Sequence, residues 1–264
     1  MNFITAFFMA WGNFITLPCP YKKWDNKLKN MMLAMLPSVG VVVGALFFVL
    51  MGAAEKLQLP DMVTTIVAEF YMFYIHGFMH LDGFMDCTDA IMSRRPLEER
   101  QRIMKDPTVG SFAVVMVCFL LLAWFACFYT VASSHWTMLY AITFMPVLSR
   151  AVSGYEVLKY KPLGHSQYVE DYEEENRGKC RVLTFVQMVV YAVIYYAVIG
   201  LMVAMPADFM WKMAAIHIAV IVVTALSGAI ARKQLGGMSG DIAGYSIIWG
   251  ELAGVIAAAV VTAY

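Results

Sequence analysis

The chain has 264 residues, 61% of them hydrophobic, and its 19 basic and 19 acidic residues give a formal net charge of zero. This apolar share exceeds the roughly half that is usual for soluble domains, and a zero net charge offers no bulk attraction to nucleic acid. The five cysteines are odd in number and form no CxxC pair, which argues against a disulfide framework and a structural zinc site.

The first 20 residues carry no charged side chain, but Gly12, Asn13, Pro18 and Pro20 interrupt them. This pattern predicts an N-terminal interfacial or re-entrant helix over 1–20 rather than a membrane span. Seven later blocks are long and apolar enough to cross about 30 Å of hydrocarbon. They cover 31–54, 62–79, 111–132, 136–150, 182–205, 213–231 and 242–263. We therefore expect an all-α polytopic membrane protein, with residues 1–264 forming one membrane-embedded domain of about seven transmembrane helices.

Basic residues gather on one side of this predicted topology. If alternate connections share a side, only Lys56 and Lys212 of the 19 basic residues lie on the opposite side. Because lysine and arginine are enriched in cytoplasmic loops, the basic side is predicted to be cytoplasmic. Its three long connections, 80–110, 156–181 and 232–241, are expected to carry the function, since loops often do. The acidic run 170–175 is expected to be a solvated loop or short helix.

The segment at 80–89 reads HLDGFMDCTD and follows the second predicted span. Asp82, Asp86 and Asp89 are spaced i, i+4 and i+7, so on a helix they share one face. Like charges this close resist ionising together, and hard divalent cations prefer such oxygen ligands. A span starting at residue 62 would end near Leu81, so the carboxylates that follow would lie at the level of the lipid headgroups. The alternative interpretation is that these aspartates form the solvated C-terminal end of a helix and bind no metal. The helix dipole counts against it, because it disfavours negative charge at a C-terminus. We therefore expect a Mg²⁺ site here.

Two more elements lie on the same side. Lys105 and Asp106, before Pro107 and Gly110, could supply a phosphate-binding cation and a metal ligand, or simply cap the next helix. The run GGMSGD at 236–241 precedes the last span, where free backbone amides and the helix dipole favour an anion. Asp241 could ligate a metal or cap that helix, and these two interpretations are equally supported.

Five ionisable residues lie within or at the end of predicted spans, where charge is costly. Arg150 suits bidentate phosphate binding but is also a common snorkelling anchor. His76 and Glu251 could line a cavity below the metal site. For these two, and for Glu69 and His217, a hydrogen-bonded contact between helices is the alternative.

These elements, in this order, resemble the cobalamin synthase family, the adenosylcobinamide-GDP ribazoletransferases, which are integral membrane enzymes of late cobalamin assembly. The family signature HLDGLxDxxDG is similar to 80–89 followed by Ala90, and MKDxxxG is matched at 104–110. A Ser/Ala-Arg-Ala element matches 149–151, and a late GGx(T/S)GD run matches 236–241. The segment FITLPCP at 14–20 is similar to the start of the family, so the resemblance covers essentially the whole chain.

The resemblance implies transfer of a cobinamide phosphate from its GDP-activated form to α-ribazole or α-ribazole 5′-phosphate, with release of GMP. It implies Mg²⁺ as the cofactor and a multi-pass protein of the bacterial inner membrane. The expected metal ligands are Asp82, Asp86, Asp89, Asp106 and Asp241. The groups expected to bind phosphate oxygens are Lys105, Gly110, Arg150, Gly237, Ser239 and Gly240. Asp89 or His80 would take the proton of the attacking hydroxyl, and the residues alone do not choose between them.

Two other functions are weighed against this one. A CDP-alcohol phosphotransferase also clusters aspartates near the headgroups, but it needs a glycine and an Ala-Arg pair where this chain has Ala90, Ile91 and Met92. A cation or substrate transporter would spread acidic residues such as Glu69 through the bilayer depth, whereas here most gather at one surface. Association with a second copy or with other cobalamin-assembly enzymes is left open.

Overall fold

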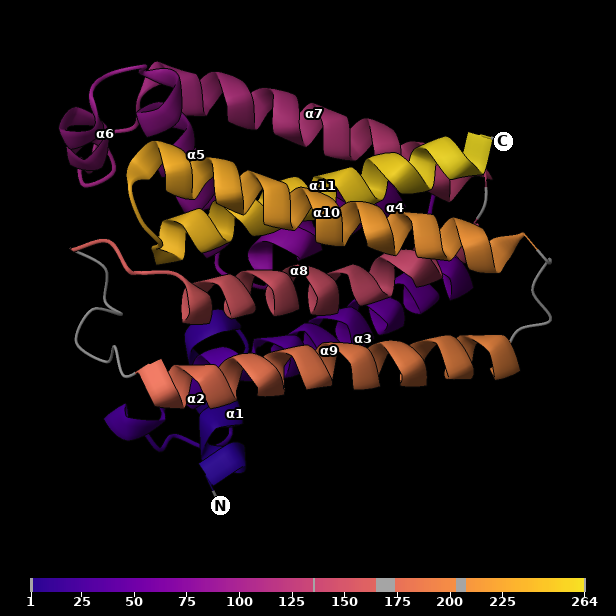
Figure 1. The fold of residues 1–264 in the computed structure, drawn as a ribbon. Coiled ribbons are helices and arrows are strands. Elements are labelled where there is room, and N and C mark those ends of the chain that lie inside the picture. The colour runs from indigo at the N-terminus through magenta and orange to yellow at the C-terminus, as the bar shows by residue number, and fades with distance from the viewer. Residues whose placement is uncertain (1, 135, 165–173, 203–207, 264) are drawn as a thin grey trace.

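The computed structural model describes residues 2–134, 136–164, 174–202 and 208–263 (Figure 1). In this part of the chain the long helices run side by side in one bundle, and α1 lies across one end of it (Figure 1). Two short 3-10 helices, Asn26–Leu28 and Trp136–Met138, precede α2 and α8. The α-helices are α1 (Asn2–Phe14), α2 (Lys29–Ala34), α3 (Leu36–Lys56), α4 (Asp61–Tyr74), α5 (Met79–Met92), α6 (Leu97–Ile103), α7 (Ser111–Ser134), α8 (Leu139–Lys159), α9 (Glu174–Met202), α10 (Phe209–Leu235) and α11 (Gly240–Ala263). The all-α prediction is confirmed for the described residues.

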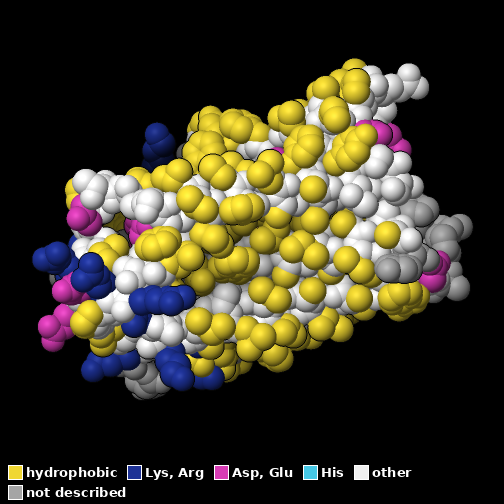
Figure 2. Space-filling model, turned by 90° about the horizontal axis from the view of Figure 1, so that it is seen from above, with side chains coloured by type: hydrophobic (Ala, Val, Ile, Leu, Met, Phe, Trp, Pro, Cys, Tyr) yellow, Lys and Arg dark blue, Asp and Glu magenta, His cyan; other side chains and the backbone are white. Residues whose placement is uncertain are grey.

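In the described ranges, five helices are long and apolar enough to cross a membrane, namely α3, α7, α9, α10 and α11, and α4 with α5 would add a sixth. Figure 2 shows a broad apolar surface, with Lys and Arg side chains gathered at one end of the bundle. We call this end, which carries α6 and the turn between α10 and α11, the basic end. The helix α8 is 21 residues long but is buried along most of its length. The predicted number of seven spans is therefore not confirmed, although the polytopic architecture is.

The N-terminal helix α1 has only 13 residues and extends about 20 Å, which is too short to cross the hydrocarbon. Its buried side chains, Thr5, Ala6, Met9 and Ala10, face the rest of the protein. Contacts with α2 and α3 hold it at the basic end. The interfacial or re-entrant position of this segment in the membrane stays a prediction.

The predicted span over 62–79 is not one straight helix, because the chain bends sharply within it. The helix α4 ends at Tyr74, and α5 starts at Met79 with its axis turned by 78°. Gly77 and Phe78 both have left-handed backbone conformations, with φ of +59° and +61°, which a right-handed helix cannot continue through. Asp82 consequently lies in the first turn of α5, where the helix dipole favours a negative charge. The argument that placed it at a helix C-terminus is therefore wrong.

Small residues bring α3 and α8 into direct backbone contact. A Cβ atom at Gly44 would lie 2.0 Å from the carbonyl oxygen of Thr143, and one at Gly40 would lie 2.5 Å from that of Pro146. Gly52, further along α3, has open space where its Cβ would be. The close approach places α8, the most deeply buried long helix, against α3.

We predict that Gly44→Ala lowers the free energy of unfolding by about 1–3 kcal/mol, because the added methyl group forces the α3 and α8 backbones apart. The matched control Gly52→Ala should be neutral or stabilising by up to about 1 kcal/mol, since alanine is the better helix former. Thermal unfolding of the purified variants in detergent measures both. Equal stability of the two variants would contradict this packing.

Candidate functional site

The helices α5 and α11 approach each other closely enough to bring the predicted aspartates together. A Cβ at Gly83 would lie 2.7 Å from the carbonyl oxygen of Asp241, and one at Gly244 would lie 3.0 Å from the Cα of His80. A larger residue at Gly83 would therefore push the two backbones apart, and at Gly244 it would leave a very tight contact. The approach sets Asp241, in the first turn of α11, beside the face of α5 that carries Asp82.

A cavity of about 250 Å³ lies at this junction. Its walls come from the end of α1 and from α2, α3, α5, α8 and α11. Five of the predicted site residues line it: His80, Asp82, Arg150, Gly240 and Asp241. Segments separated by up to 234 positions in the sequence, from Asn13 to Ile247, therefore converge on one small polar space.

The carboxylates around this cavity repel one another. The charge of Asp86 interacts unfavourably with Asp82, Asp241 and Asp89, in that order of strength. Within the described residues, neither Asp82 nor Asp86 makes a side-chain hydrogen bond or ion pair with a cationic residue. An all-oxygen, uncompensated donor set is chemically suited to a hard divalent cation. No three His, Cys, Asp or Glu side chains in the described ranges converge on one metal position, so binding requires these side chains to rotate.

Asp89 has a different environment from the other two carboxylates of α5. Its Oδ2 accepts a hydrogen bond from the backbone N–H of Gly110 at 2.7 Å, and its Oδ1 accepts one from Ala113 at 2.9 Å. A Cβ at Gly110 would lie 2.5 Å from Oδ1, so this glycine makes room for the carboxylate. Asp89 therefore stabilises the N-terminus of α7. Its predicted role as a metal ligand and proton acceptor stays a prediction.

Lys105 and Asp106 are exposed on the loop between α6 and α7. Asp106 accepts hydrogen bonds from the hydroxyl and the backbone N–H of Thr108. These hydrogen bonds lower the pKa of the Asp106 carboxyl. Neither residue belongs to the cavity lining that the described chain forms, so their predicted phosphate and metal contacts are untested.

The glycine-rich turn before α11 is fixed by its neighbours. Met238 pairs with Pro162 in an isolated bridge, and a Cβ at Gly237 would lie 2.8 Å from the side chain of Leu163. Ser239 accepts a hydrogen bond from the N–H of Ile242 and so caps α11. Gly237 and Ser239 thus stabilise the turn and do not line the cavity, whereas Gly240 does.

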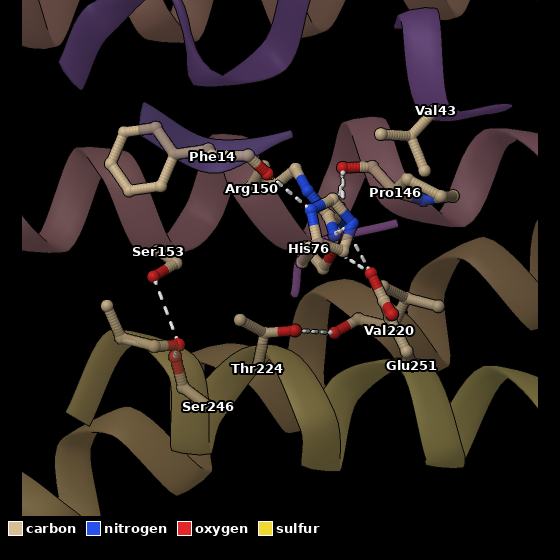
Figure 3. A network of polar contacts seen from close by, with 12 residues as sticks. Phe14, Val43, His76, Pro146, Arg150, Ser153, Val220, Thr224, Ser246 and Glu251 are labelled. Atoms are coloured by element: carbon tan, nitrogen blue, oxygen red, sulfur yellow. Dashed lines mark hydrogen bonds and ion pairs between the residues drawn. The ribbon is translucent and has the colours of Figure 1, made fainter. Parts of the chain in front are cut away.

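Arg150 lies at the centre of a buried polar network (Figure 3). Its Nη1 is 2.6 Å from Oε1 of Glu251 and also donates to the carbonyl oxygen of Pro146. Ser149 donates to the same Glu251 oxygen at 2.7 Å. Arg150 thus joins α8 to α11 while one side of it lines the cavity. Its predicted phosphate contact stays open, but the ion pair to Glu251 is a further role that the sequence did not indicate.

His76 completes the network from the break between α4 and α5. Its Nε2 accepts a hydrogen bond from Nη2 of Arg150, because a guanidinium can only donate. Its Nδ1 therefore carries the proton, which it donates to the carbonyl oxygen of Phe14 at 2.7 Å. Neither His76 nor Glu251 lines the cavity. Of the two interpretations of these residues, the structure supports hydrogen-bonded contacts between helices.

Other predicted residues lie away from this site. His217 bonds to the hydroxyl of Tyr196 and to the carbonyl oxygen of Ala141, so it links three helices. Glu69 lies on α4, with Oε1 buried and without a hydrogen-bond partner in the described part of the chain. The acidic run 170–175 lies outside the residues whose side chains are described.

Sequence reasoning assigned no role to three polar residues of this region. Asn13 and Ser153 line the cavity, and Ser149 binds Glu251. The signal for the serines was present: Ser149 and Ser153 lie four residues apart, on one face of the same segment that carries Arg150.

Comparison with known proteins gives matches along the whole chain. The family model described as cobalamin-5-phosphate synthase matches residues 6–259. An adenosylcobinamide-GDP ribazoletransferase of Clostridium perfringens strain 13 is 31% identical over 257 residues, covering 96% of this chain and 97% of the relative. Proteins of the same name from Lachnoclostridium phytofermentans and Listeria monocytogenes are 31% and 29% identical, covering 96% and 83% of this chain and 92% and 82% of the relatives. No solved structure matches.

We predict that Glu251→Gln destabilises the protein by about 3–5 kcal/mol, because it leaves the Arg150 guanidinium buried without its counter-ion. The matched control Glu99→Gln removes the same charge from an exposed pair with Arg95, at 3.9 Å, and should change stability by less than about 1 kcal/mol. Thermal unfolding in detergent compares them. A Glu251→Gln protein as stable as the Glu99→Gln protein would show that the buried pair contributes nothing.

Proposed function

The chain belongs to the cobalamin-5-phosphate synthase family and is a transferase of late cobalamin synthesis, and we propose how its cavity carries out the transfer. The substrates are adenosylcobinamide-GDP and α-ribazole or its 5′-phosphate. A ribose hydroxyl oxygen attacks the phosphorus nearer the cobinamide, the bond from that phosphorus to the bridging oxygen breaks, and GMP leaves. The observation that carries this proposal is the convergence of His80, Asp82, Arg150, Gly240 and Asp241 on one cavity.

Asp82, Asp86 and Asp241 are the residues we propose as ligands of Mg²⁺. The observations in favour are the repulsion of Asp86 by both Asp82 and Asp241 and, within the described residues, the absence of a cationic partner for Asp82 and Asp86. When bound, Mg²⁺ would neutralise charge on the diphosphate. Asp106 and Asp89 are weaker candidates, because Asp106 is bound to its own loop and Asp89 caps α7.

The other groups of the cavity would position the diphosphate. Arg150 presents a guanidinium whose orientation is fixed by Glu251 and His76, so little side-chain entropy is lost when it binds an oxygen. The N-terminus of α11, with Gly240 at its start, offers backbone N–H groups and a favourable dipole. A 250 Å³ space suits a diphosphate, so the corrin and the nucleoside would extend beyond it.

We propose His80 as the group that takes the proton from the attacking hydroxyl. It lines the cavity, whereas both carboxylate oxygens of Asp89 accept backbone hydrogen bonds from α7. The His80 ring lies against that of His76, with centroids 4.6 Å apart, which restrains its orientation.

The basic end is proposed to face the cytoplasm, and the membrane is proposed to be the bacterial inner membrane. The support is the excess of lysine and arginine at that end (Figure 2). Association with a second copy or with other enzymes of cobalamin assembly stays a prediction.

We predict that Asp82→Asn removes nearly all GMP release from cobinamide-GDP and α-ribazole 5′-phosphate, since a neutral amide binds more weakly the cation that would neutralise the diphosphate. The matched control Asp61→Asn changes an acidic first-turn residue of α4 outside the cavity and should keep wild-type turnover. Purified protein in detergent, with GMP measured by chromatography, gives the result. Wild-type-like turnover of Asp82→Asn would overturn the assignment.

We predict that EDTA abolishes GMP release and that added Mg²⁺ restores it, because the diphosphate must be neutralised for the leaving group to depart. The same preparation in proteoliposomes should show no uptake of cation or substrate linked to its activity. Full turnover in EDTA would contradict the metal proposal, and uptake without GMP release would favour the transporter alternative.

A further inference from the structure

A second groove lies on the opposite face of α8 from the cavity. It has a volume of about 710 Å³ and is formed by α8, α9 and α10. Arg150, Ser153 and Val157 of α8 face the cavity, whereas Val152, Tyr155 and Lys159 of the same helix face the groove. In Figure 1, α8 is seen between α9 and α10, and both of these helices pack against it. The groove is therefore separate from the proposed active site.

The long part of the groove is apolar and lies between two helices able to cross a membrane. Val182, Phe185 and Met188 of α9 form one wall, Ala225 of α10 forms the other, and Ala151 and Val152 of α8 form the floor. Both α9 and α10 meet the length and hydropathy needed for a span. A groove of this kind in a bilayer is lined by the same chemistry as lipid tails, so an acyl chain fills it at no cost in desolvation.

The end of the groove toward the basic end is cationic. Lys159 and Arg181 line it, together with Glu156. The carboxylate of Glu156 is paired with Arg232, with Oε2 and Nη1 2.6 Å apart. Among the described lining residues, Lys159 and Arg181 thus bring two cationic groups to this end of the groove.

Aromatic rings hold the cations at this end. The Nζ of Lys159 is 5.2 Å from the ring centroid of Tyr160 and 5.7 Å from that of Tyr155. The guanidinium of Arg232 lies 3.7 Å from the centroid of Tyr160. Lys159 is seven residues, about 10 Å along the helix, from Val152. That separation matches the step from a headgroup phosphate to the upper acyl chain.

We propose that this groove is a binding site for one anionic phospholipid. Its phosphate lies beside Lys159 and Arg181, and one acyl chain lies between α9 and α10 against Phe185 and Ala225. The occupant packs on the back of the helix that carries Arg150, and the proposal does not depend on the transferase reaction.

The test is native mass spectrometry of the full-length protein in detergent, titrated with palmitoyl-oleoyl phosphatidylglycerol or with phosphatidylcholine of the same chains. One phosphatidylglycerol should bind at least several-fold more tightly than phosphatidylcholine. The double variant Lys159→Gln/Arg181→Gln should weaken that binding by about tenfold or more, because each cation near a phosphate contributes roughly a kcal/mol. The control Lys161→Gln/Lys233→Gln removes two exposed cations that do not line the groove and should bind as the wild type does.

A second pair of variants tests the acyl chain. Ala225→Phe fills the groove and should reduce phosphatidylglycerol binding, whereas Leu226→Phe, at a neighbouring position that is 57% exposed, should not. Equal affinity for the two lipids would overturn the proposal, as would binding that survives both groove variants. Glycerol phosphate that binds as well as the lipid would also overturn it, since the site would then recognise only a free phosphate. Unchanged melting temperatures confirm that the variants are folded.

Discussion

The arrangement of the site depends on the ion pair between Arg150 and Glu251 inside the bundle. A guanidinium and a carboxylate removed from water are costly unless they pair well and their remaining donors are satisfied. Here the remaining contacts come from Ser149, Pro146 and His76. Because His76 also binds the carbonyl oxygen of Phe14, one network joins the end of α1, the break before α5, and the helices α8 and α11. The end of α1, the helices α8 and α11, and the helix α5 that begins after the break each contribute a wall to the cavity.

The break after α4 determines where the aspartates of α5 lie. A straight helix from residue 61 onward would carry Asp82 and Asp86 away along its own axis. The 78° turn instead lays α5 across α11, where Gly83 and Gly244 let the backbones meet. The carboxylates of α5 and of Asp241 are thereby close enough to interact electrostatically. Asp82 and Asp241 each lie in the first turn of their helix, where the helix dipole favours a negative charge. The repulsion among these carboxylates is the observation on which the proposed Mg²⁺ site rests.

Much of this was predictable from local pattern, and the rest was not. The i, i+4, i+7 spacing correctly placed Asp82, Asp86 and Asp89 on one helix, and the basic loops correctly indicated a common end of the bundle. The break was missed although Gly77, the residue type that most often ends a helix, lies at it in a left-handed conformation, together with a left-handed Phe78 that its residue type does not predict. Asp89 as a cap, and Glu251 as the partner of Arg150, join residues 21 to 101 positions apart. One sequence contains no signal for such pairings.

The central claim is that α5 and α11 build one site, and a double-mutant cycle between Asp82 and Asp241 tests it most directly. Asp82→Glu, Asp241→Glu and the double variant keep the charge but displace it, so residual GMP release can be measured for each. If both carboxylates act on the same diphosphate, their effects on kcat/KM are strongly non-additive, with a coupling of about 1 kcal/mol or more. Effects that add within about 0.5 kcal/mol would contradict a shared site.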